Sequence, residues 1–212
     1  MEEREERLAR EVARIRDTLG QLPPAVARPV LVMAAGLPGA GKSHLCRLLA
    51  RRLACVIVQS DAVRQTLFRR PTYTPDESFW VFAVIHQLLR DLLRAGIPVI
   101  LDATNLLKSN REQVYRIAEQ TGAKLIIVWV EAPPEVVFAR MERRAARADQ
   151  TDRSEADWAV YEKLRAKVEP ITRPHFVVDT SRDVRPMVNK VVREARRCYH
   201  NGAYPRNRTE QR

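Results

Sequence analysis

Cysteine is scarce in this sequence of 212 residues. Only Cys46, Cys55 and Cys198 occur, with no C-x-x-C pair and no spacing to histidine that is typical of a zinc site. We therefore expect neither a disulfide framework nor structural zinc, but free thiols in a reducing compartment. A chain of this length buries enough surface to fold around one core without such help.

Long apolar runs are also missing. No run approaches the roughly 18 residues that a membrane-spanning helix needs. The first ten residues, MEEREERLAR, are charged and lack the apolar stretch of a signal peptide. From these two absences we expect a cytoplasmic protein with no membrane partner.

Acidic residues are outnumbered. Lys plus Arg number 37 against 26 Asp plus Glu, which gives a net charge of +11, and 31 of the basic residues are arginine. A positive field attracts nucleic acids and nucleotides. Arginine pairs such as Arg51-Arg52 and Arg196-Arg197 are spread along the chain, however, so solvated arginine-rich faces explain the same count.

Apolar residues recur at helical spacing near the N-terminus. Leu8, Val12, Ile15 and Leu19 are separated by four, three and four residues, which predicts an apolar stripe on a charged helix over residues 2–19. The stripe could dock on the rest of the chain or pair with a second copy in a homo-oligomer. We divide the chain into this amphipathic segment (1–24), a main domain (25–197) and a loose basic tail (198–212).

Strand and helix patterns alternate from residue 30 onward. The strands are continuous apolar runs, which indicates a sheet covered on both faces. We predict an α/β fold with three layers and a five-stranded parallel sheet. The expected strands are VLVMAAG (30–36), CVIVQS (55–60), VILDAT (99–104), KLIIVWVEAPP (124–134) and HFVVDTS (175–181). Helices are expected after residue 41, over roughly 76–95, from a Ser109 cap to a Gly122 stop, over 134–147 and over 183–197.

The segment GLPGAGKS at 36–43 fits the pattern G-x-x-x-x-G-K-[ST] between a predicted strand and an amphipathic helix. Glycines there let backbone N–H groups converge on phosphate at a helix N-terminus. We expect Lys42 to add positive charge and Ser43 to ligate Mg²⁺, so the loop predicts a site for a nucleoside triphosphate with Mg²⁺. The expected binding residues are Gly36, Gly39, Ala40, Gly41, Lys42, Ser43 and His44.

A guanine-reading N-K-x-D motif is absent, because NKVV at 189–192 lacks the aspartate. This absence excludes the switch GTPases, and no room remains for the second helical domain of a ring ATPase. A small kinase that uses ATP remains.

The acceptor side is expected in QSDAVRQTL (59–67), where Asp61 and Arg64 share a helical face at the end of the second strand. Asp61 could accept a hydroxyl proton while Arg64 grips an anion; a helix cap with a surface arginine is the alternative.

Two further segments lie at the same predicted edge. VILDATN places Asp102, Thr104 and Asn105 at the end of the third strand, where Asp102 could hold Mg²⁺ and the other two could bond substrate. The helix after the fourth strand carries arginines three and four residues apart, and they could form a mobile lid over the triphosphate or merely a solvated face. These are Arg140, Arg143, Arg144 and Arg147.

The sequence resembles the kinase domain of polynucleotide 5′-hydroxyl kinases in four segments, namely GLPGAGKS, SDAVR, LDATN and RMERR. It equally resembles a broad set of bacterial P-loop kinases that are related to zeta toxins and often labelled ATPases. The resemblance covers roughly residues 30–197 and implies a helical lid at about 140–170. It implies that Asp61 is the general base and that Arg64 binds a phosphate of the acceptor. It also implies that Arg140 and Arg144 are catalytic lid arginines and that Arg182 lies against the adenine. No phosphatase motif (D-x-D-x-T) and no ligase module accompanies the kinase.

Three functions stay open. We favour transfer to the 5′-hydroxyl of RNA or DNA. The first alternative is transfer to a hydroxyl of a sugar, nucleoside or antibiotic, and the second is an ATP-dependent binding or toxin module with weak ATPase activity. The segment RRPTYTPDESFW (69–80) supplies Tyr73, Phe79 and Trp80 beside two arginines, which suits an acceptor pocket that stacks bases. Phe79 and Trp80 could equally be core residues of the following helix, which leaves Tyr73 as the expected substrate contact.

Overall fold

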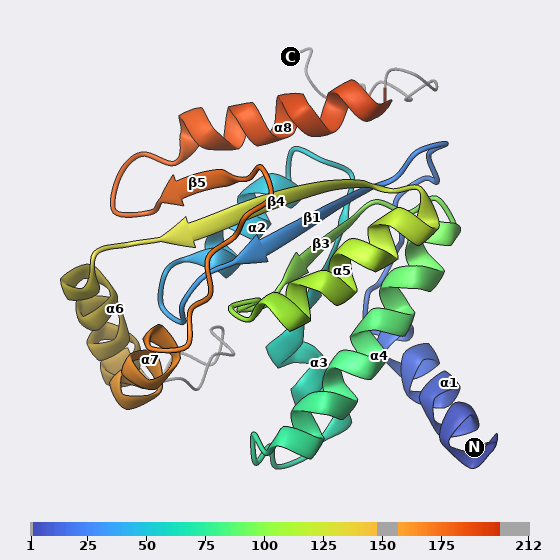
Figure 1. The fold of residues 1–212 in the computed structure, drawn as a ribbon, viewed down its shortest axis with the longest axis horizontal. Helices are drawn as coiled ribbons and strands as arrows, with labels where there is room; N and C mark the ends of the chain where they lie inside the picture. Colours follow the sequence, from blue (N-terminus) through green and yellow to red (C-terminus); the bar gives the residue numbers. More distant parts are fainter. Residues whose placement is uncertain (1, 148–156, 200–212) are drawn as a thin grey trace.

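The computed structural model describes residues 2–147 and 157–199 and shows a sheet of five parallel strands in the order β2-β3-β1-β4-β5 (Figure 1). The predicted three-layer α/β fold is confirmed. The strands are β1 (Val30–Ala35), β2 (Val56–Gln59), β3 (Val99–Asp102), β4 (Lys124–Glu131) and β5 (Phe176–Asp179). The helices are α1 (Glu2–Asp17), α2 (Lys42–Ala50), α3 (Ser60–Leu67), α4 (Pro75–Arg94), α5 (Lys108–Thr121), α6 (Pro134–Arg147), α7 (Trp158–Arg165) and α8 (Arg185–Tyr199).

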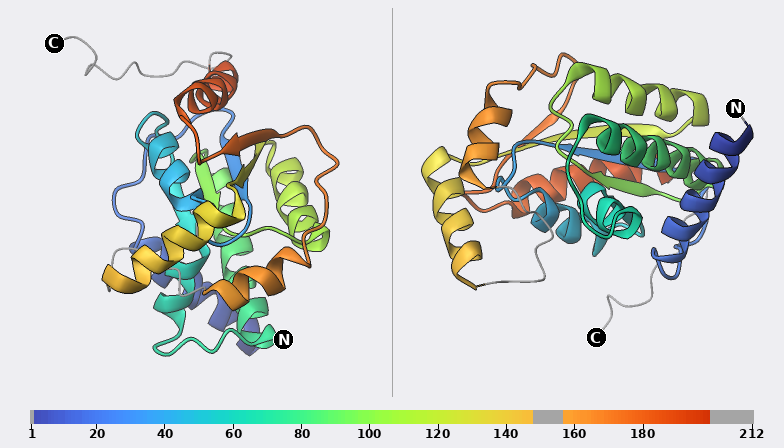
Figure 2. Two further views of the ribbon diagram at one scale, coloured as in Figure 1. Left: turned by 90° about the vertical axis from the view of Figure 1, so that its left-hand side faces the viewer. Right: turned by 90° about the horizontal axis from the view of Figure 1, so that it is seen from below.

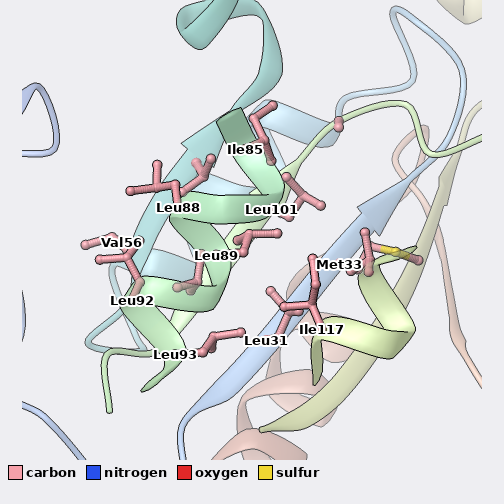
Figure 3. Packing of buried hydrophobic residues seen from close by; sticks show 14 of the residues in the cluster. Leu31, Met33, Val56, Ile85, Leu88, Leu89, Leu92, Leu93, Leu101 and Ile117 are labelled. Carbon is pink, nitrogen blue, oxygen red and sulfur yellow. The ribbon is translucent and has the colours of Figure 1, made fainter. Parts of the chain in front are cut away.

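Alternate residues of the central strand face two different cores, as a pleated strand requires. Leu31 and Met33 of β1 pack with α4 and α5 on one face, where α4 presents a row of buried leucines (Figure 3). Val30 and Val32 pack with α2 and α8 on the other face. Because both faces of β1 are buried, this strand is apolar throughout, and this is why the sequence predicted it well.

The N-terminal helix docks on the rest of the chain. Val12 and Ile15 of α1 are buried in the core that contains α4, with Leu8 and Leu19 packed at its margin. On the outer side, the Arg4 and Arg7 guanidiniums lie 5.4 Å and 4.7 Å from the ring centroids of Phe79 and Trp80. The apolar stripe is therefore satisfied within one copy of the chain.

Two helices differ from expectation. The N-cap of α5 is Leu107, without a side-chain cap, so the predicted Ser109 cap is wrong; the left-handed Gly122 at its C-terminus (φ +67°) is as predicted. Helix α7 lies within the helical lid expected at about 140–170, but its bounds were not predicted, because its eight residues are too few to show a clear period.

Helices α6 and α7 lie at the carboxyl end of the strands, nearest the viewer in the left view of Figure 2. The middle of the predicted lid (148–156), the side chain of Arg147 and nearly all of the predicted tail (200–212) fall outside the described residues. Within the described ranges, no helix is both long and apolar enough to span a bilayer.

Candidate active site

The loop between β1 and α2 adopts a conformation that only glycine permits at its key positions. Gly36, Gly39 and Gly41 have φ values of +147°, +75° and +92°. A Cβ on Gly36 would lie 2.1 Å from the carbonyl oxygen of Val130 on the neighbouring strand, far inside van der Waals contact. Gly41 is the N-cap of α2 and makes no side-chain cap, so the first turn of that helix presents its N–H groups beside the loop, as an anion site requires.

Lys42 and Ser43 begin α2 and line one cavity. The Lys42 side chain is 9% exposed, and its Nζ donates to the Leu37 carbonyl across the loop (2.9 Å). The Ser43 hydroxyl accepts a long hydrogen bond from Gln59 Nε2 (3.4 Å). Gln59 ends β2 and was not foreseen as a site residue, although its place at a strand end was a usable signal.

Strand register brings Asp102 to the same place. Asp102 ends β3 opposite Ala34 of β1 and Gln59 of β2, is 3% exposed and lines the cavity with Lys42 and Ser43. The pKa of the buried Cys46 thiol in α2 is raised, first by burial and then by the Asp102 carboxylate. Asp102 therefore supplies negative charge beside the start of α2.

The donor set fits Mg²⁺ held partly by a nucleotide. The described residues contain no group of three or more His, Cys, Asp or Glu placed to hold a metal. Mg²⁺ is commonly bound through one or two carboxylates plus substrate phosphates instead, and one hydroxyl and one carboxylate are what Ser43 and Asp102 offer.

The cavity has a volume of about 860 Å³ and joins segments that are distant in the sequence. Walls come from the phosphate loop, α3, the ends of β2 and β3, α6, α7 and the turn after β5. The predicted site residues that line it are Gly39, Gly41, Lys42, Ser43, His44, Asp61, Arg64, Tyr73, Asp102, Thr104, Arg140, Arg144 and Arg182. Gly36, Ala40 and Asn105 do not line it.

Asp61 lies in the first turn of α3 and faces the cavity. The N-cap of α3 is Gln59, so the alternative of Asp61 as the helix cap is wrong. Arg64 is buried rather than on the surface and forms an ion pair with Glu77, which is buried as well. A second guanidinium nitrogen of Arg64 donates to Ser78 Oγ (3.1 Å).

The aromatic residues of 69–80 separate into two groups. Tyr73 lines the cavity, is 45% exposed and lies over the Arg64 guanidinium, 4.7 Å from ring centroid to Cζ. Phe79 is exposed and contacts Arg4, whereas Trp80 is partly buried against the core and contacts Arg7. The two α4 aromatics are thus engaged with α1, and only Tyr73 of the three faces the cavity.

Arg140 is anchored to the phosphate loop through a residue that the sequence did not single out. Its guanidinium donates to the Thr180 hydroxyl (2.8 Å), to the Thr180 carbonyl (2.8 Å) and, weakly, to the Gly39 carbonyl (3.4 Å). The Thr180 hydroxyl itself donates to the Ala40 carbonyl (2.7 Å). Thr180 therefore joins α6, the phosphate loop and the turn after β5.

The other arginines of α6 and the turn after β5 do not behave alike. Arg144 lines the cavity beside Arg140, whereas Arg143 borders a separate, smaller hollow. Arg182 stands at the cavity margin with its side chain 84% exposed and its Nε 3.3 Å from Asp179. Among the three arginines of α6 whose side chains the structure describes, the expected single face is therefore divided, with Arg140 and Arg144 at the cavity.

The segment after β3 supports the phosphate loop. The Thr104 carbonyl accepts from the Gly36 N–H (2.9 Å), and Asn105, 1% exposed, donates to the Ala34 carbonyl (2.7 Å). Arg111, also missed by sequence reasoning, is buried and donates to the Asn105 (3.1 Å) and Leu106 (2.6 Å) carbonyls. Asn105 was expected to bind substrate; its burial and its bond to β1 give it a structural role instead.

A glycine-rich phosphate loop after the central strand, with a carboxylate at the adjacent strand end and arginines from α6 over the same cavity, defines a P-loop kinase-like protein. The chain belongs to the AAA_33 family, described as an AAA domain, which matches residues 31–171. The family match covers the loop, α3, the β3 end and α6, and stops before β5.

Known proteins similar to the chain include kinases. The adenylyl-sulfate kinase of Myxococcus xanthus is 35% identical over 109 residues, which are 50% of this chain and 59% of that enzyme. The chain thus spans about three-fifths of that relative. A gluconokinase from Sinorhizobium meliloti superposes with a TM-score of 0.58 at 19% identity, over 82% of this chain and 95% of that one.

The Pnkp1/Rnl/Hen1 RNA repair complex contains a further structural relative. It superposes with a TM-score of 0.55 at 24% identity, over 68% of this chain and 44% of that one. These structural likenesses establish a shared fold. The kinase-like character is confirmed, whereas the specific resemblance to the polynucleotide kinases is not.

Proposed function

We propose that the protein is an ATP- and Mg²⁺-dependent phosphotransferase that moves the γ-phosphate of ATP to a hydroxyl group of a small molecule. One observation carries the proposal: the phosphate loop, the Asp61 carboxylate and the Arg140 and Arg144 guanidiniums line a single cavity. A donor site, a candidate base and cations for the transferring group are the parts that phosphoryl transfer needs.

On the donor side, the N–H groups of the loop and of the first turn of α2 bind the triphosphate. Lys42, now bonded to the Leu37 carbonyl, exchanges that bond for a phosphate oxygen. Ser43 and Asp102 would hold Mg²⁺, which when bound neutralises charge on the phosphates. Arg140 is held on Thr180, so it is already oriented toward the loop before any ligand arrives.

On the acceptor side, Asp61 orients the hydroxyl and accepts its proton as the hydroxyl oxygen bonds to the γ-phosphorus and the bond from that phosphorus to the bridging oxygen of ADP breaks, which releases ADP. Apolar side chains from three helices contribute to the same cavity, namely Phe82 of α4, Met141 of α6, and Val160 and Leu164 of α7. They lie beside many charged and polar side chains, and the cavity volume of about 860 Å³ is within the range of about 300–1,000 Å³ that is typical of small-ligand sites, which favours a small acceptor.

The 5′-hydroxyl end of a nucleic acid is the second candidate acceptor. The exposed Tyr73 at the cavity supports it, together with the exposed Arg69 and Arg70 that precede it in the chain. Single strands are commonly held by an aromatic platform beside basic residues.

The test is transfer from γ-labelled ATP with Mg²⁺ to a panel of nucleosides, sugars and a 5′-hydroxyl oligonucleotide. We expect a labelled small acceptor, and loss of labelling in Lys42→Ala. Labelling of the oligonucleotide alone would select the second candidate. ATP hydrolysis with no labelled acceptor would overturn the kinase proposal in favour of an ATP-dependent binding module.

A further inference from the structure

Arg64, which lies one helical turn after the proposed base Asp61, already has a counter-ion. Arg64 and Glu77 form a buried ion pair between α3 and α4, and Arg64 lines the cavity. The pair carries no net charge. In the sequence, thirteen residues separate the two side chains, so the pairing was not visible from the D-x-x-R element alone.

Glu77 is held in place by more than Arg64. Its carboxylate accepts from the Thr72 N–H (2.7 Å), the Thr72 hydroxyl (2.8 Å) and the Tyr73 N–H (3.3 Å). Burial alone would raise the pKa of Glu77, but these bonds and the one from Arg64 outweigh it and lower the pKa from 4.5 to about 2. The carboxylate is therefore ionised at neutral pH.

The same carboxylate fixes the loop that carries Tyr73. Tyr73 has a positive φ of +56°, a conformation that a residue with a Cβ keeps only where its surroundings enforce it. Glu77 bonds the N–H groups of Tyr73 and of the residue before it, and Arg64 lies against the Tyr73 ring. The cavity wall thus contains a connected unit of three residues, namely Arg64, Glu77 and Tyr73.

We infer that the acceptor subsite takes a neutral, ring-bearing hydroxyl compound, such as a nucleoside, in preference to its phosphorylated counterpart. Glu77 is the positioning residue that sets this preference, because it occupies Arg64 and holds Tyr73 at the cavity. The inference rests on the proposed function, whose donor site and base it uses.

The physical reason is competition for Arg64. To pair with Arg64, an acceptor phosphate would have to displace Glu77, and removing the partner of a buried charge is strongly unfavourable. A phosphate that did not displace Glu77 would find the charge of Arg64 already neutralised and would still lose its own hydration. A neutral ring meets neither cost and gains contact with the exposed Tyr73 ring.

The first experiment uses the wild-type chain and two matched pairs of acceptors. These are adenosine with adenosine 3′-monophosphate, which share the same 5′-hydroxyl, and a neutral hexose with its monophosphate. Initial rates of transfer from γ-labelled ATP give kcat/KM for each. We expect the neutral member of the productive pair to be preferred by about tenfold or more, the ratio that one charge-assisted contact supports.

The second experiment moves the charge. Glu77→Gln should free Arg64 for an anion and shift the ratio toward the phosphorylated acceptor by about tenfold or more, mainly through KM. Asp76→Asn is the matched control, since the exposed Asp76 loses the same charge one residue away and should leave the ratio unchanged. A ratio of two substrates measured on one preparation does not depend on how much of the variant is folded.

The outcomes separate the two proposals. A wild-type preference for the phosphorylated acceptor overturns the inference and leaves the kinase intact. An unchanged ratio in Glu77→Gln overturns the role of Glu77. If the wild type labels no member of either pair and none of the wider acceptor panel, while ATP is still bound, the proposed function fails and the inference fails with it.

Discussion

His86 provides a prediction about stability whose size follows from the structure. It lies on α4, with its ring centroid 5.9 Å from that of the cavity-lining Phe82, and its Nε2 is buried with no hydrogen-bond partner among the described residues. Burial, and secondarily the charge of Arg90, lowers the pKa of His86 from 6.5 to about 4. The folded protein therefore keeps this imidazole neutral at a pH where the unfolded chain protonates it.

The sign and size of the effect follow from linkage. Between pH 6.5 and 4 the unfolded state binds the extra proton, so the free energy of unfolding falls as the pH falls through this window. A shift of this size at 1.36 kcal/mol per pKa unit amounts to about 3 kcal/mol of stability, present above pH 6.5 and lost by pH 4. The stability that ionised Glu77 contributes is lost at lower pH, between pH 4.5 and about 2, because folding lowers the pKa of Glu77 from 4.5 to about 2.

The assay is urea denaturation of the wild type and of His86→Leu at intervals from pH 7.5 to pH 4. The difference in unfolding free energy between the two proteins should change by about 3 kcal/mol across the window, in favour of the variant at low pH. His175→Asn, at an exposed histidine, is the control and should follow the wild type. A difference that stays constant with pH would show that the burial of His86 does not contribute to the pH dependence of stability.

Three other substitutions test the site and the core. Gly36→Ala places a Cβ 2.1 Å from the Val130 carbonyl oxygen at φ +147°, so it should lower stability by about 3 kcal/mol or more and abolish ATP binding measured by calorimetry. The control is Gly122→Ala, which has open space at φ +67° and should lower stability by only about 1 kcal/mol and leave ATP binding unchanged. Equal losses of stability in the two variants would contradict the close contact at Gly36. Thr180→Val removes the hydroxyl bonds to Arg140 and Ala40 and keeps the bond from Arg140 to the residue-180 carbonyl; it should lower kcat by about tenfold to a hundredfold with little loss of fold. An unaltered kcat would show that Arg140 does not need the Thr180 hydroxyl. Leu89→Ala, in the fully buried row of α4, should lower the free energy of unfolding measured with urea by about 2–5 kcal/mol without changing acceptor preference. A decrease below about 1 kcal/mol would mean that this face of the sheet is loosely packed.

The parts of the fold that were predictable are those determined by local pattern. The parallel sheet was predictable because its strands are continuous apolar runs. The phosphate loop was predictable because its positive φ angles require glycine at Gly36, Gly39 and Gly41, which the short segment displays. Asp61 and Asp102 were predictable as cavity residues because parallel strands all end at one edge.

The parts that were missed depend on contacts between distant segments. Glu77 meets Arg64, and Thr180 meets Arg140 forty residues away, and neither pairing leaves a periodic signal. Asn105 looked like a substrate residue because it follows a strand, but its left-handed backbone (φ +47°) and its bond to the Ala34 carbonyl turn it toward β1. Polar side chains at strand ends thus include both site residues and supports, and sequence alone does not separate them.

The most direct test of the account is a single measurement on Asp61→Asn. Two quantities are measured in the same buffer: the single-turnover rate of transfer from γ-labelled ATP to the best acceptor of the panel, and the affinity for ATP. If Asp61 is the general base, the variant should bind ATP as tightly as the wild type, and its transfer rate should be lower by roughly a hundredfold to ten-thousandfold. Transfer at the wild-type rate would contradict this role, because the carboxylate that shares the cavity with the phosphate loop would then have no part in the chemistry.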